Sequence, residues 1–235
     1  MPIFPLFLPP DQRERLEAFA RMLIDENRVL NLTAVTDLDE VRVRHVEDSL
    51  AALPYLREIA SDAPSLIDIG SGAGLPGLAL AIALPEWRIV SVEATGKKAR
   101  FQKKVVQALG LSNVTVTQGR AETLAHDPAH RERYDAATAR ALAPLPVVAE
   151  LTLPFVRLGG SALAWKGPSA DEEIARARRA CDRLGGRVGR EIAYHLSVPP
   201  SDAPRLFRLV ILSKTQPTPA AYPRGPNAIR KRPLG

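Results

Sequence analysis

Apolar residues recur with a helical period at the start of the chain. Between positions 11 and 30, the apolar positions near a 3.6-residue spacing are Leu16, Phe19, Ala20, Leu23, Ile24 and Leu30. This spacing places them on one face, so it predicts an amphipathic helix that begins at Asp11. A second helix is expected to begin at Asp37, because Glu40 follows three residues later in the spacing of a capping box.

The second helix carries three polar residues close together. Arg44 and Asp48 are four positions apart, and His45 and Asp48 are three apart. Residues at these spacings are neighbours on a helix surface. All three side chains are therefore expected to share one side of this helix.

From about residue 64 the pattern changes to short apolar runs that alternate with helical segments. The expected strands are 65–69, 89–92, 114–117, 135–139 and 161–165. The expected helices are 76–83, 97–109, 143–156 and 171–184. Two late β-rich runs, 190–198 and 206–213, have no helix between them and predict an antiparallel pair. Together these runs predict an α/β fold: a doubly wound, mostly parallel seven-stranded sheet with helices on both faces and an N-terminal helical extension.

The composition is that of an ordinary globular chain of 235 residues, 46% hydrophobic and 25% charged. One cysteine, Cys181, excludes a disulfide scaffold, and no apolar run approaches the roughly 20 residues of a membrane span. The apolar start, 1–10, has four prolines and no basic region, so we do not interpret it as a signal peptide. A reducing cytoplasm is the expected compartment.

The charge favours a nucleic-acid partner. Lys and Arg number 32 against 26 acidic residues, a net charge of +6, and 25 of the 32 are arginine. The planar guanidinium suits phosphate and stacks on bases, although genomic base composition produces the same bias. The tail 215–235 has five prolines and no acid. It predicts either a solvated, disordered tail or a segment that contacts RNA. The basic residues of this tail are Arg224, Arg230, Lys231 and Arg232.

The strongest chemical signal is the run 68–77, Asp-Ile-Gly-Ser-Gly-Ala-Gly-Leu-Pro-Gly. Glycines after a buried strand allow a tight turn and let a ligand approach the backbone. Pro76 suits the first turn of the next helix, whose free amides then face the ligand. A turn that serves only helix–sheet packing is the alternative. The strand before, the helix after and an acid further on favour a nucleotide site.

The further acid is Glu93, which ends the second expected strand 23 positions after Gly70. A carboxylate there can accept hydrogen bonds from both ribose hydroxyls, and the turn 119–122 would form the wall beside an adenine ring. Asp68, two residues before Gly70, is poorly placed for pyrophosphate and well placed for an ammonium group. S-adenosylmethionine carries an ammonium, a sulfonium, a ribose diol and an adenine without phosphate, so these residues favour it over a dinucleotide.

Several joined motifs in order along the chain resemble the RsmG (GidB) family. They are Asn31-Leu32-Thr33-Ala34-Val35, Arg44-His45 with Asp48-Ser49, the run 68–77, Glu93 with Lys97-Lys98, Arg120-Ala121-Glu122, Arg140-Ala141 after Asp135, and Tyr222-Pro223-Arg224 with Lys231-Arg232-Pro233-Leu234. The resemblance implies a bacterial class I methyltransferase that uses S-adenosylmethionine to methylate guanine N7 in 16S ribosomal RNA of the small subunit. It also implies donor contacts at Gly70, Leu75, Ala121, Glu122 and Arg140. Some relatives have aspartate at the position of Glu93.

This chemistry needs little acid–base help. The lone pair of guanine N7 lies in the ring plane, so the enzyme must chiefly align donor and acceptor, and we name no general base. Arg140, after the fourth strand, is expected to touch donor or base, with a structural ion pair as the alternative. Cytosine C5 methylation needs a cysteine nucleophile, and Cys181 lies on a predicted surface helix, so we expect it to be inert.

The expected site therefore has two parts and no metal. The donor residues are Asp68, Gly70, Gly72, Gly74, Leu75, Glu93, Ala121, Glu122 and Arg140. The residues expected to form a basic mouth for RNA are Arg44, His45, Lys97, Lys98, Lys166 and Arg140. Aromatic residues make up 5% of the chain, which argues against extensive base stacking, and Trp165 and Tyr194 are expected in the core or on a strand face.

We divide the chain into a helical cap at 1–60, a methyltransferase domain at 61–214 and the basic tail, all in one compact, monomeric unit. Three alternatives remain: a small-molecule methyltransferase of the same fold, a catalytically silent RNA-binding module, and a dinucleotide-dependent oxidoreductase, which Asp68 disfavours.

Overall fold

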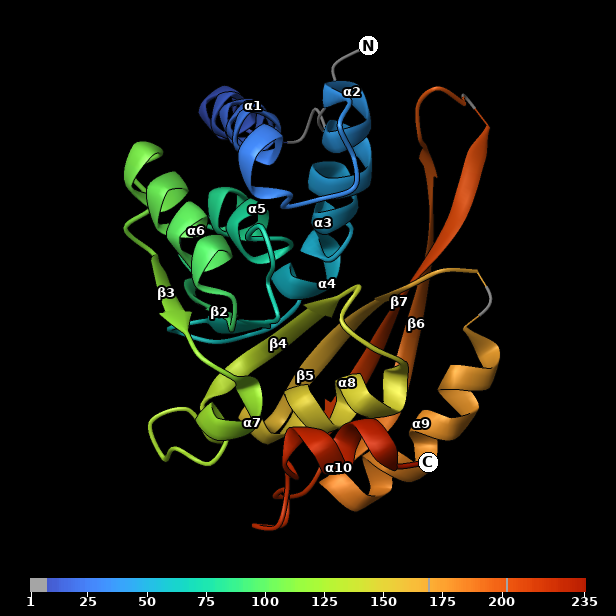
Figure 1. The fold of residues 1–235 in the computed structure, drawn as a ribbon. Coiled ribbons are helices and arrows are strands. Elements are labelled where there is room, and N and C mark those ends of the chain that lie inside the picture. The colour runs from blue at the N-terminus through green and yellow to red at the C-terminus, as the bar shows by residue number, and fades with distance from the viewer. Residues whose placement is uncertain (1–7, 169, 202) are drawn as a thin grey trace.

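A single seven-stranded sheet forms the centre of the protein (Figure 1). The computed structural model describes residues 8–168, 170–201 and 203–235. The strands are β1 (Ser65–Ile69), β2 (Arg88–Glu93), β3 (Val114–Gln118), β4 (Tyr134–Arg140), β5 (Val156–Lys166), β6 (Gly186–Ser197) and β7 (Pro204–Lys214). Their order is β3-β2-β1-β4-β5-β7-β6; the first five are parallel neighbours, and β7 is antiparallel to both β5 and β6. This confirms the predicted fold class and the predicted antiparallel pair.

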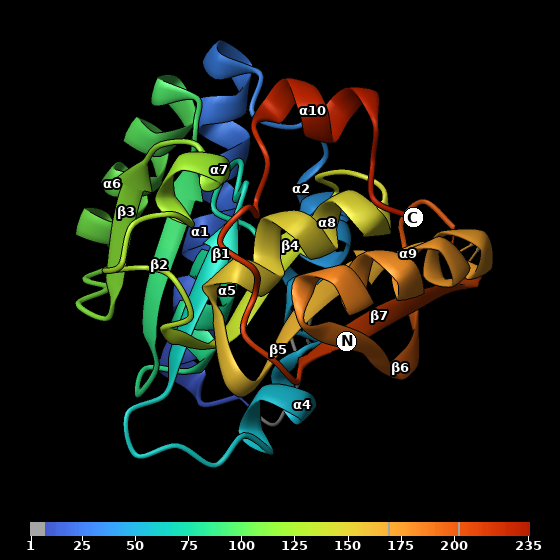
Figure 2. The same ribbon diagram turned by 90° about the horizontal axis from the view of Figure 1, so that it is seen from below.

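Helices cover both faces of the sheet (Figures 1 and 2). One face carries α1 (Pro10–Leu30), α2 (Leu38–Val41), the π-helical η1 (Arg42–Glu47), α3 (Asp48–Leu50), α4 (Leu53–Arg57), α5 (Gly77–Ala83) and α6 (Gly96–Ala108). The other carries α7 (Ala121–Leu124), α8 (Leu145–Thr152), the 3-10 helix η2 (Leu153–Phe155), α9 (Asp171–Leu184) and α10 (Pro226–Lys231).

The strands divide their side chains between two apolar cores. Leu66 of β1 and Ile89 of β2 face the α1–α6 side, and the next residues, Ile67 and Val90, face the α8–α9 side. Side chains alternate along a strand, and here both faces are covered. The central strands therefore read in the sequence as continuous apolar runs.

The N-terminal helices belong to the first of these cores. Leu16, Phe19 and Leu23 of α1 are fully buried, as their spacing predicts. The predicted helix start is also present, because the Asp37 carboxylate accepts a hydrogen bond from the backbone N–H of Glu40 at 2.8 Å; the Glu40 carboxylate pairs with Arg44. The helix expected after it runs without a break from Leu38 to Leu50, and its middle part, η1, is π-helical. π-helical turns are frequent at functional sites, and this one carries Arg44 and His45.

One predicted helix is too long at both ends. The segment expected at 143–156 is helical only from Leu145 to Phe155, and Val156 already belongs to β5. Pro154 removes a helical N–H and promotes the tight last turn at Leu153–Phe155. The strand β5 is correspondingly longer than predicted and starts five residues earlier.

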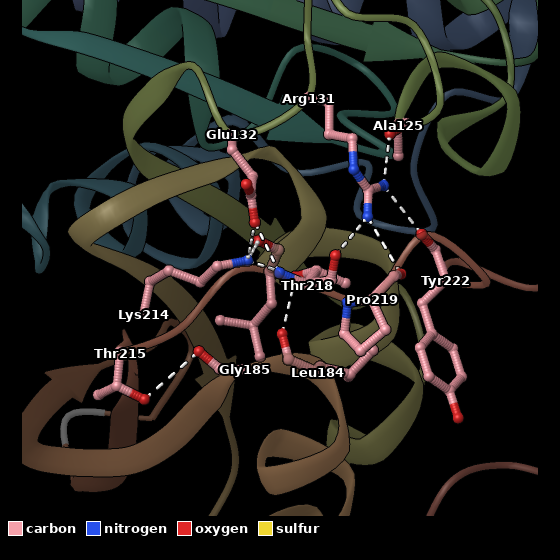
Figure 3. A network of polar contacts seen from close by, with 11 residues as sticks. Ala125, Arg131, Glu132, Leu184, Gly185, Lys214, Thr215, Thr218, Pro219 and Tyr222 are labelled. Atoms are coloured by element: carbon pink, nitrogen blue, oxygen red, sulfur yellow. Dashed lines mark hydrogen bonds and ion pairs between the residues drawn. The ribbon is translucent and has the colours of Figure 1, made fainter.

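The C-terminal tail is anchored to the α8–α9 side by polar contacts (Figure 3). The Arg131 guanidinium donates to the backbone oxygens of Ala125, Tyr222, Thr218 and Pro219 at 2.7–3.1 Å. The buried ammonium of Lys214 pairs with Glu132 at 2.9 Å and also bonds Thr218. Ile229 and Leu234 of the tail are buried in the apolar core on the α8–α9 side of the sheet. A solvated, disordered tail is therefore the wrong interpretation for these residues.

Within the described part of the chain, no helix combines the length and hydropathy that a membrane crossing needs. The same residues contain no group of three or more His, Cys, Asp or Glu side chains arranged to hold a metal ion.

Candidate active site

The glycine run forms a loop that is tied to the end of the neighbouring strand. It leaves β1 at Ile69 and enters α5 at Gly77, one residue later than predicted. The backbone N–H groups of Gly70 and Ser71 donate to the carbonyl of Val92 at 2.9 and 3.1 Å. The N–H of Gly72 donates to the Glu93 carboxylate at 2.9 Å. The loop conformation therefore depends on the carboxyl end of β2.

Asp68 holds the other end of this loop from inside the protein. It is fully buried; one carboxylate oxygen accepts the Gly77 N–H at 2.8 Å and the other accepts the Thr138 hydroxyl at 2.9 Å. A Cβ on Gly77 would lie 2.7 Å from the Asp68 oxygen, so only glycine fits there. The expectation that Asp68 faces the donor ammonium is thus wrong, since both oxygens point into the protein. Asp68 is a positioning residue for the loop.

Burial raises the pKa of Asp68 from its ordinary value of 3.8 to about 6. The hydrogen bonds from Thr138 and Gly77 and the charge of Arg140 oppose this rise, and the nearby Glu93 adds to it. Because the folded pKa lies above the unfolded one, the protonated carboxyl stabilises the fold fully below about pH 4. This contribution is lost as pH rises through about 6.

We expect Asp68→Asn to remove this pH dependence. Asparagine can still accept from Gly77 and donate to the Thr138 oxygen, but it does not ionise. The free energy of unfolding of the variant, relative to wild type, should rise by about 3 kcal/mol between pH 4 and pH 7, the equivalent of two pKa units. Urea unfolding at four pH values measures this difference. A difference that stays constant with pH would show that Asp68 is ionised throughout.

A narrow cleft of about 170 Å³ lies where the ends of β1, β2 and β3 meet the following loops. Its lining residues are Ile69, Gly70, Val92, Ala94, Gly119, Arg120, Ala121, Glu122, Leu142 and Leu151. The structure thus brings together Gly70, Ala121 and Glu122 of the predicted donor set. A wider cavity of about 610 Å³ shares Arg120, Glu122 and Leu151 with this cleft and extends to α10.

The other predicted donor residues lie around the cleft without lining it. Gly72, Gly74 and Leu75 shape the loop, and Glu93 is 6% exposed. The second Glu93 oxygen accepts the Thr95 N–H at 2.6 Å, so this carboxylate joins the loop to the start of α6. Arg140 lines a different cavity, described below.

The polar groups of the loop suit a cationic ligand better than a phosphate. The N–H groups of Gly70, Ser71, Gly72 and Gly77, which a pyrophosphate would need, all donate to acceptors within the chain. Two carboxylates, Asp68 and Glu93, hold the loop in place. Their negative field favours the ammonium and sulfonium of S-adenosylmethionine over the phosphates of a dinucleotide.

A second cavity of about 370 Å³ lies beside the ends of β4 and β5. Its lining residues are Arg44, His45, Asp48, Arg140, Ala141, Trp165, Lys166, Gly167, Tyr194, Leu196 and Phe207. Four of the predicted RNA-contacting residues, Arg44, His45, Lys166 and Arg140, meet here. Lys97 and Lys98 do not: they lie in the first turn of α6, where Lys97 donates to the carbonyl of Leu30 at 2.7 Å.

Asp48 holds the walls of this second cavity. One carboxylate oxygen accepts from Arg140 at 2.8 Å and the other accepts the Tyr194 hydroxyl. Its backbone oxygen accepts the Trp165 indole N–H at 2.8 Å. Arg140 also donates to the carbonyl of His45 at 2.9 Å. The ion pair considered as the alternative for Arg140 is therefore present, and it belongs to the wall of a cavity.

His45 is not one of the positive charges of this cavity. Burial and the nearby Arg140 lower its pKa to about 4, so the imidazole is neutral at physiological pH. Its Nε2 lies 2.7 Å from the Thr33 hydroxyl. His45 lines this cavity, where the prediction placed it, but the neutral imidazole adds no charge to it. Lys166 is largely enclosed, with its ammonium 2.8 Å from both the Ala143 carbonyl and Glu173.

The two cavities are separated by the loop that follows β4. Ala141 lines the larger cavity and Leu142 lines the narrow cleft. Ala141 has a φ of +51°, a left-handed conformation that residues other than glycine, asparagine and aspartate rarely adopt. Such strained residues cluster at active sites, where the surrounding structure holds them in place.

Cys181 is inert, as expected, for a different reason from the one given. It lies on the buried side of α9 instead of on the surface, and burial raises the pKa of its thiol to about 12. A thiol that stays protonated is a poor nucleophile.

Sequence reasoning missed the aromatic residues of the second cavity. Trp165, Tyr194 and Phe207 come from β5, β6 and β7; Trp165 lies in the core and Tyr194 packs against it, as expected, but their place in a cavity was not predicted. Asp48 was noted only as a neighbour of Arg44 and His45 and as part of a family motif. Two features of the sequence could have pointed to Asp48. It stands in one motif with Arg44-His45, and a buried Trp165 indole N–H or Tyr194 hydroxyl needs a hydrogen-bond acceptor.

The sheet order, the glycine loop after β1 and the acid that ends β2 define a class I methyltransferase. Residues 12–193 match the family model GidB, described as rRNA small subunit methyltransferase G, and the chain belongs to this family. Its methyl donor is S-adenosylmethionine.

Similar proteins share nearly the whole chain. Ribosomal RNA small subunit methyltransferase G of Roseiflexus castenholzii is 47% identical over 231 residues, 95% of this chain and 93% of the relative. The protein of the same name from Leuconostoc citreum is 39% identical over 227 residues, 97% of this chain and 93% of the relative.

Two solved structures share the fold. M. jannaschii TYW2 in complex with AdoMet has a TM-score of 0.54 at 10% identity, covering 75% of this chain and 80% of that one. A 16S rRNA (adenine(1408)-N(1))-methyltransferase with cosubstrate SAM from Catenulisporales acidiphilia has a TM-score of 0.51 at 17% identity, covering 66% and 86%. At these identities the likeness concerns the fold alone.

Proposed function

We propose that this protein transfers a methyl group from S-adenosylmethionine to N7 of a guanine in 16S ribosomal RNA. The observation that carries the proposal is the pair of cavities on either side of the strained Ala141 loop. One cavity adjoins the carboxylate-held glycine loop, and the other gathers arginines, a lysine and aromatic rings. Membership in a family of small-subunit rRNA methyltransferases supports this substrate class.

On the donor side, Gly70, Ala121 and Glu122 line the cleft that would hold the adenosine part. Glu93 accepts two backbone N–H groups, and its remaining lone pairs are available to ribose hydroxyls. Leu75 lies in the loop between β1 and α5, and Arg140 ends β4, beside the loop that separates the cavities. When bound, the donor supplies an electrophilic methyl group on its sulfonium.

On the acceptor side, the protein mainly has to orient the guanine; it does not have to move a proton. No proton must leave guanine before N7 attacks, so alignment supplies most of the rate. His45 suits this role as a neutral wall residue, since its Nε2 is occupied by Thr33. The Arg140 guanidinium is held by Asp48 and the His45 carbonyl, so its position does not have to change when the donor and the guanine are aligned.

Of the cations around the second cavity, Arg44 is exposed and is expected to contact an RNA phosphate, whereas Arg140 and Lys166 are held by Asp48 and Glu173 and add positive charge to the cavity wall. Three further exposed cations lie on the tail: Arg230, Lys231 and Arg232. We propose that the tail adds to RNA affinity and that the helical cap at 1–60 and the tail at 215–235 serve the domain at 61–214. The cap includes residues 1–7, which lie outside the described part of the chain. The proposed setting is a cytoplasmic monomer acting on the small subunit or its assembly intermediate.

The proposal is tested by supplying purified protein with labelled donor and small subunits that lack the modification. Label is expected in one guanine of 16S rRNA, at N7, and subunits that already carry the modification should accept none. Donor turnover without RNA would favour the small-molecule alternative. RNA binding without any transfer would favour the silent module.

Salt should weaken this reaction strongly. With about three phosphate contacts, kcat/KM for the subunit is expected to fall by about 20- to 40-fold between roughly 50 and 200 mM salt. The dissociation constant of the donor, measured by calorimetry over the same range, should change much less. A salt-independent kcat/KM would contradict phosphate contacts at these side chains.

A further inference from the structure

We propose that the 370 Å³ cavity receives the target guanine after this base has been extruded from the RNA, and that Phe207 and its neighbouring rings stack on it. This inference rests on the proposed function and extends it, because it assigns the residues that bind the acceptor base.

The position of the cavity relative to the donor cleft is the first argument. Consecutive residues, Ala141 and Leu142, line the second cavity and the donor cleft respectively. The reacting atoms of a methyl transfer must come within about 3–3.5 Å of each other. The loop after β4, which is left-handed at Ala141, thus contributes one residue to each cavity, so a base in the second cavity and a donor in the cleft would lie next to each other.

The aromatic lining is the second argument. Trp165, Tyr194 and Phe207 are three of the twelve aromatic residues of the chain, and all three line this cavity. The rings of Tyr194 and Phe207 stack with centroids 5.8 Å apart at an interplanar angle of 24°. Enzymes that act on a base take it out of the helical stack and hold it between aromatic or apolar side chains. A volume of 370 Å³ has room for one base.

The third argument is that these walls are fixed before any ligand arrives. The Asp48 carboxylate bonds the Tyr194 hydroxyl and Arg140, and its backbone oxygen bonds the Trp165 indole. Two rings and one guanidinium are thus oriented by a single buried residue, which we assign as a positioning residue. Preorganised walls reduce the entropy lost when a flexible nucleotide binds.

The charges around the cavity suit the backbone of the same nucleotide. The Arg44 side chain is 48% exposed and pairs with Glu40 in an exposed ion pair, which contributes little to stability. Its guanidinium is therefore free to exchange this partner for a phosphate. A neutral small substrate would have no use for such a rim, so an RNA base is the ligand that the lining favours.

The test compares two substitutions of Phe207. Phe207→Leu keeps an apolar side chain but removes the ring, and Phe207→Tyr keeps the ring. With unmodified small subunits, Phe207→Leu should lower kcat/KM by at least about tenfold, the effect of losing one base–aromatic stack. Phe207→Tyr should stay within about threefold of wild type. Both variants should bind S-adenosylmethionine, measured by calorimetry, within about twofold of wild type.

Leu206→Ala is the matched control. Leu206 is the neighbouring residue on β7, lies on the opposite side of the strand and does not line the cavity. It should retain wild-type kcat/KM, which separates stacking from a general effect on the hairpin. Circular dichroism and the melting temperature identify any variant that fails to fold. If Phe207→Leu does not fold, kcat/KM of Phe207→Tyr is still compared with that of wild type.

The outcomes distinguish this inference from the proposed function. If wild type methylates the subunit and Phe207→Leu does so equally well, the pocket assignment is overturned while the function stands. A loss of donor affinity in Phe207→Leu that matches its loss of kcat/KM also overturns it, because Phe207 would then act at the donor site. If wild type itself fails to methylate the subunit, the proposed function fails first.

Discussion

Glu93→Ala is expected to lower kcat/KM for methyl transfer by more than about 100-fold while the protein stays folded. The carboxylate accepts N–H groups from Gly72 and Thr95, so it joins the glycine loop to α6, and we propose that its remaining lone pairs accept ribose hydroxyls. Each hydrogen bond to a charged group is worth about 1.5–3 kcal/mol, and two lost donor contacts account for this factor. Calorimetric titration with S-adenosylmethionine should show the same loss of affinity.

Glu86→Ala supplies the control for this variant. Glu86 is exposed in the turn before β2, at the opposite end of the strand from Glu93, and its removal changes the net charge equally. It should leave donor affinity unchanged. Glu93→Gln keeps a side-chain oxygen but loses the charge, so its affinity for S-adenosylmethionine should lie between those of Glu93→Ala and Glu86→Ala.

Gly72→Asp tests the same assignment independently of Glu93. Gly72 has a φ of +58° with open space around its Cα, so the variant strains the loop and adds a third carboxylate beside it. We expect methylation to be abolished. Full activity in both Gly72→Asp and Glu93→Ala would contradict the donor site.

Arg224→Ala is expected to destabilise the protein by about 3–5 kcal/mol, because it leaves the carboxylate of Glu150 buried and unpaired. Glu150 on α8 is fully buried; Arg224 donates to it from Nε at 2.8 Å, from Nη2 at 2.6 Å and from its backbone N–H at 2.9 Å. For a chain of this size the melting temperature should fall by about 10 °C. Thermal and urea unfolding measure both quantities.

The double variant Glu150→Gln with Arg224→Ala separates the lost charge pair from the lost packing. It should be more stable than Arg224→Ala alone, because the buried charge is gone. Lys231→Ala, an exposed cation of the same tail, should change the free energy of unfolding by less than about 0.5 kcal/mol. If Arg224→Ala costs no more than Lys231→Ala, the tail is not anchored at Glu150.

Much of the donor side could be predicted from the sequence because its determinants are local. The glycine run, the strand before it and the helix after it lie within twenty residues, and Glu93 follows at the end of the next strand. Parallel strands place their carboxyl ends at one edge of the sheet, so a motif at the end of β1 and an acid at the end of β2 meet there. What failed was the direction of one side chain, that of Asp68, which depends on Thr138 of β4.

The acceptor side could not be predicted in this way. Asp48 meets Trp165 and Tyr194 across separations of 117 and 146 residues, through strands whose order in the sheet differs from their order in the chain. The neutral state of His45 also has a distant cause, since Arg140 and burial lower its pKa. Periodicity reports which face of an element is apolar; it does not report which elements meet.

The sequence by itself determined the sheet and its helices, the glycine loop and the chemical class of the donor, because backbone preference and side-chain period act over a few residues. Only the tertiary structure decided that three rings and two arginines line one cavity, that the tail is bound by Arg131 and Arg224, and that Ala141 and Leu142 line neighbouring cavities. Those features arise from side chains that become neighbours only once β4, β5, β6 and β7 have paired, and their free energy comes from burial and hydrogen bonds that an extended chain lacks.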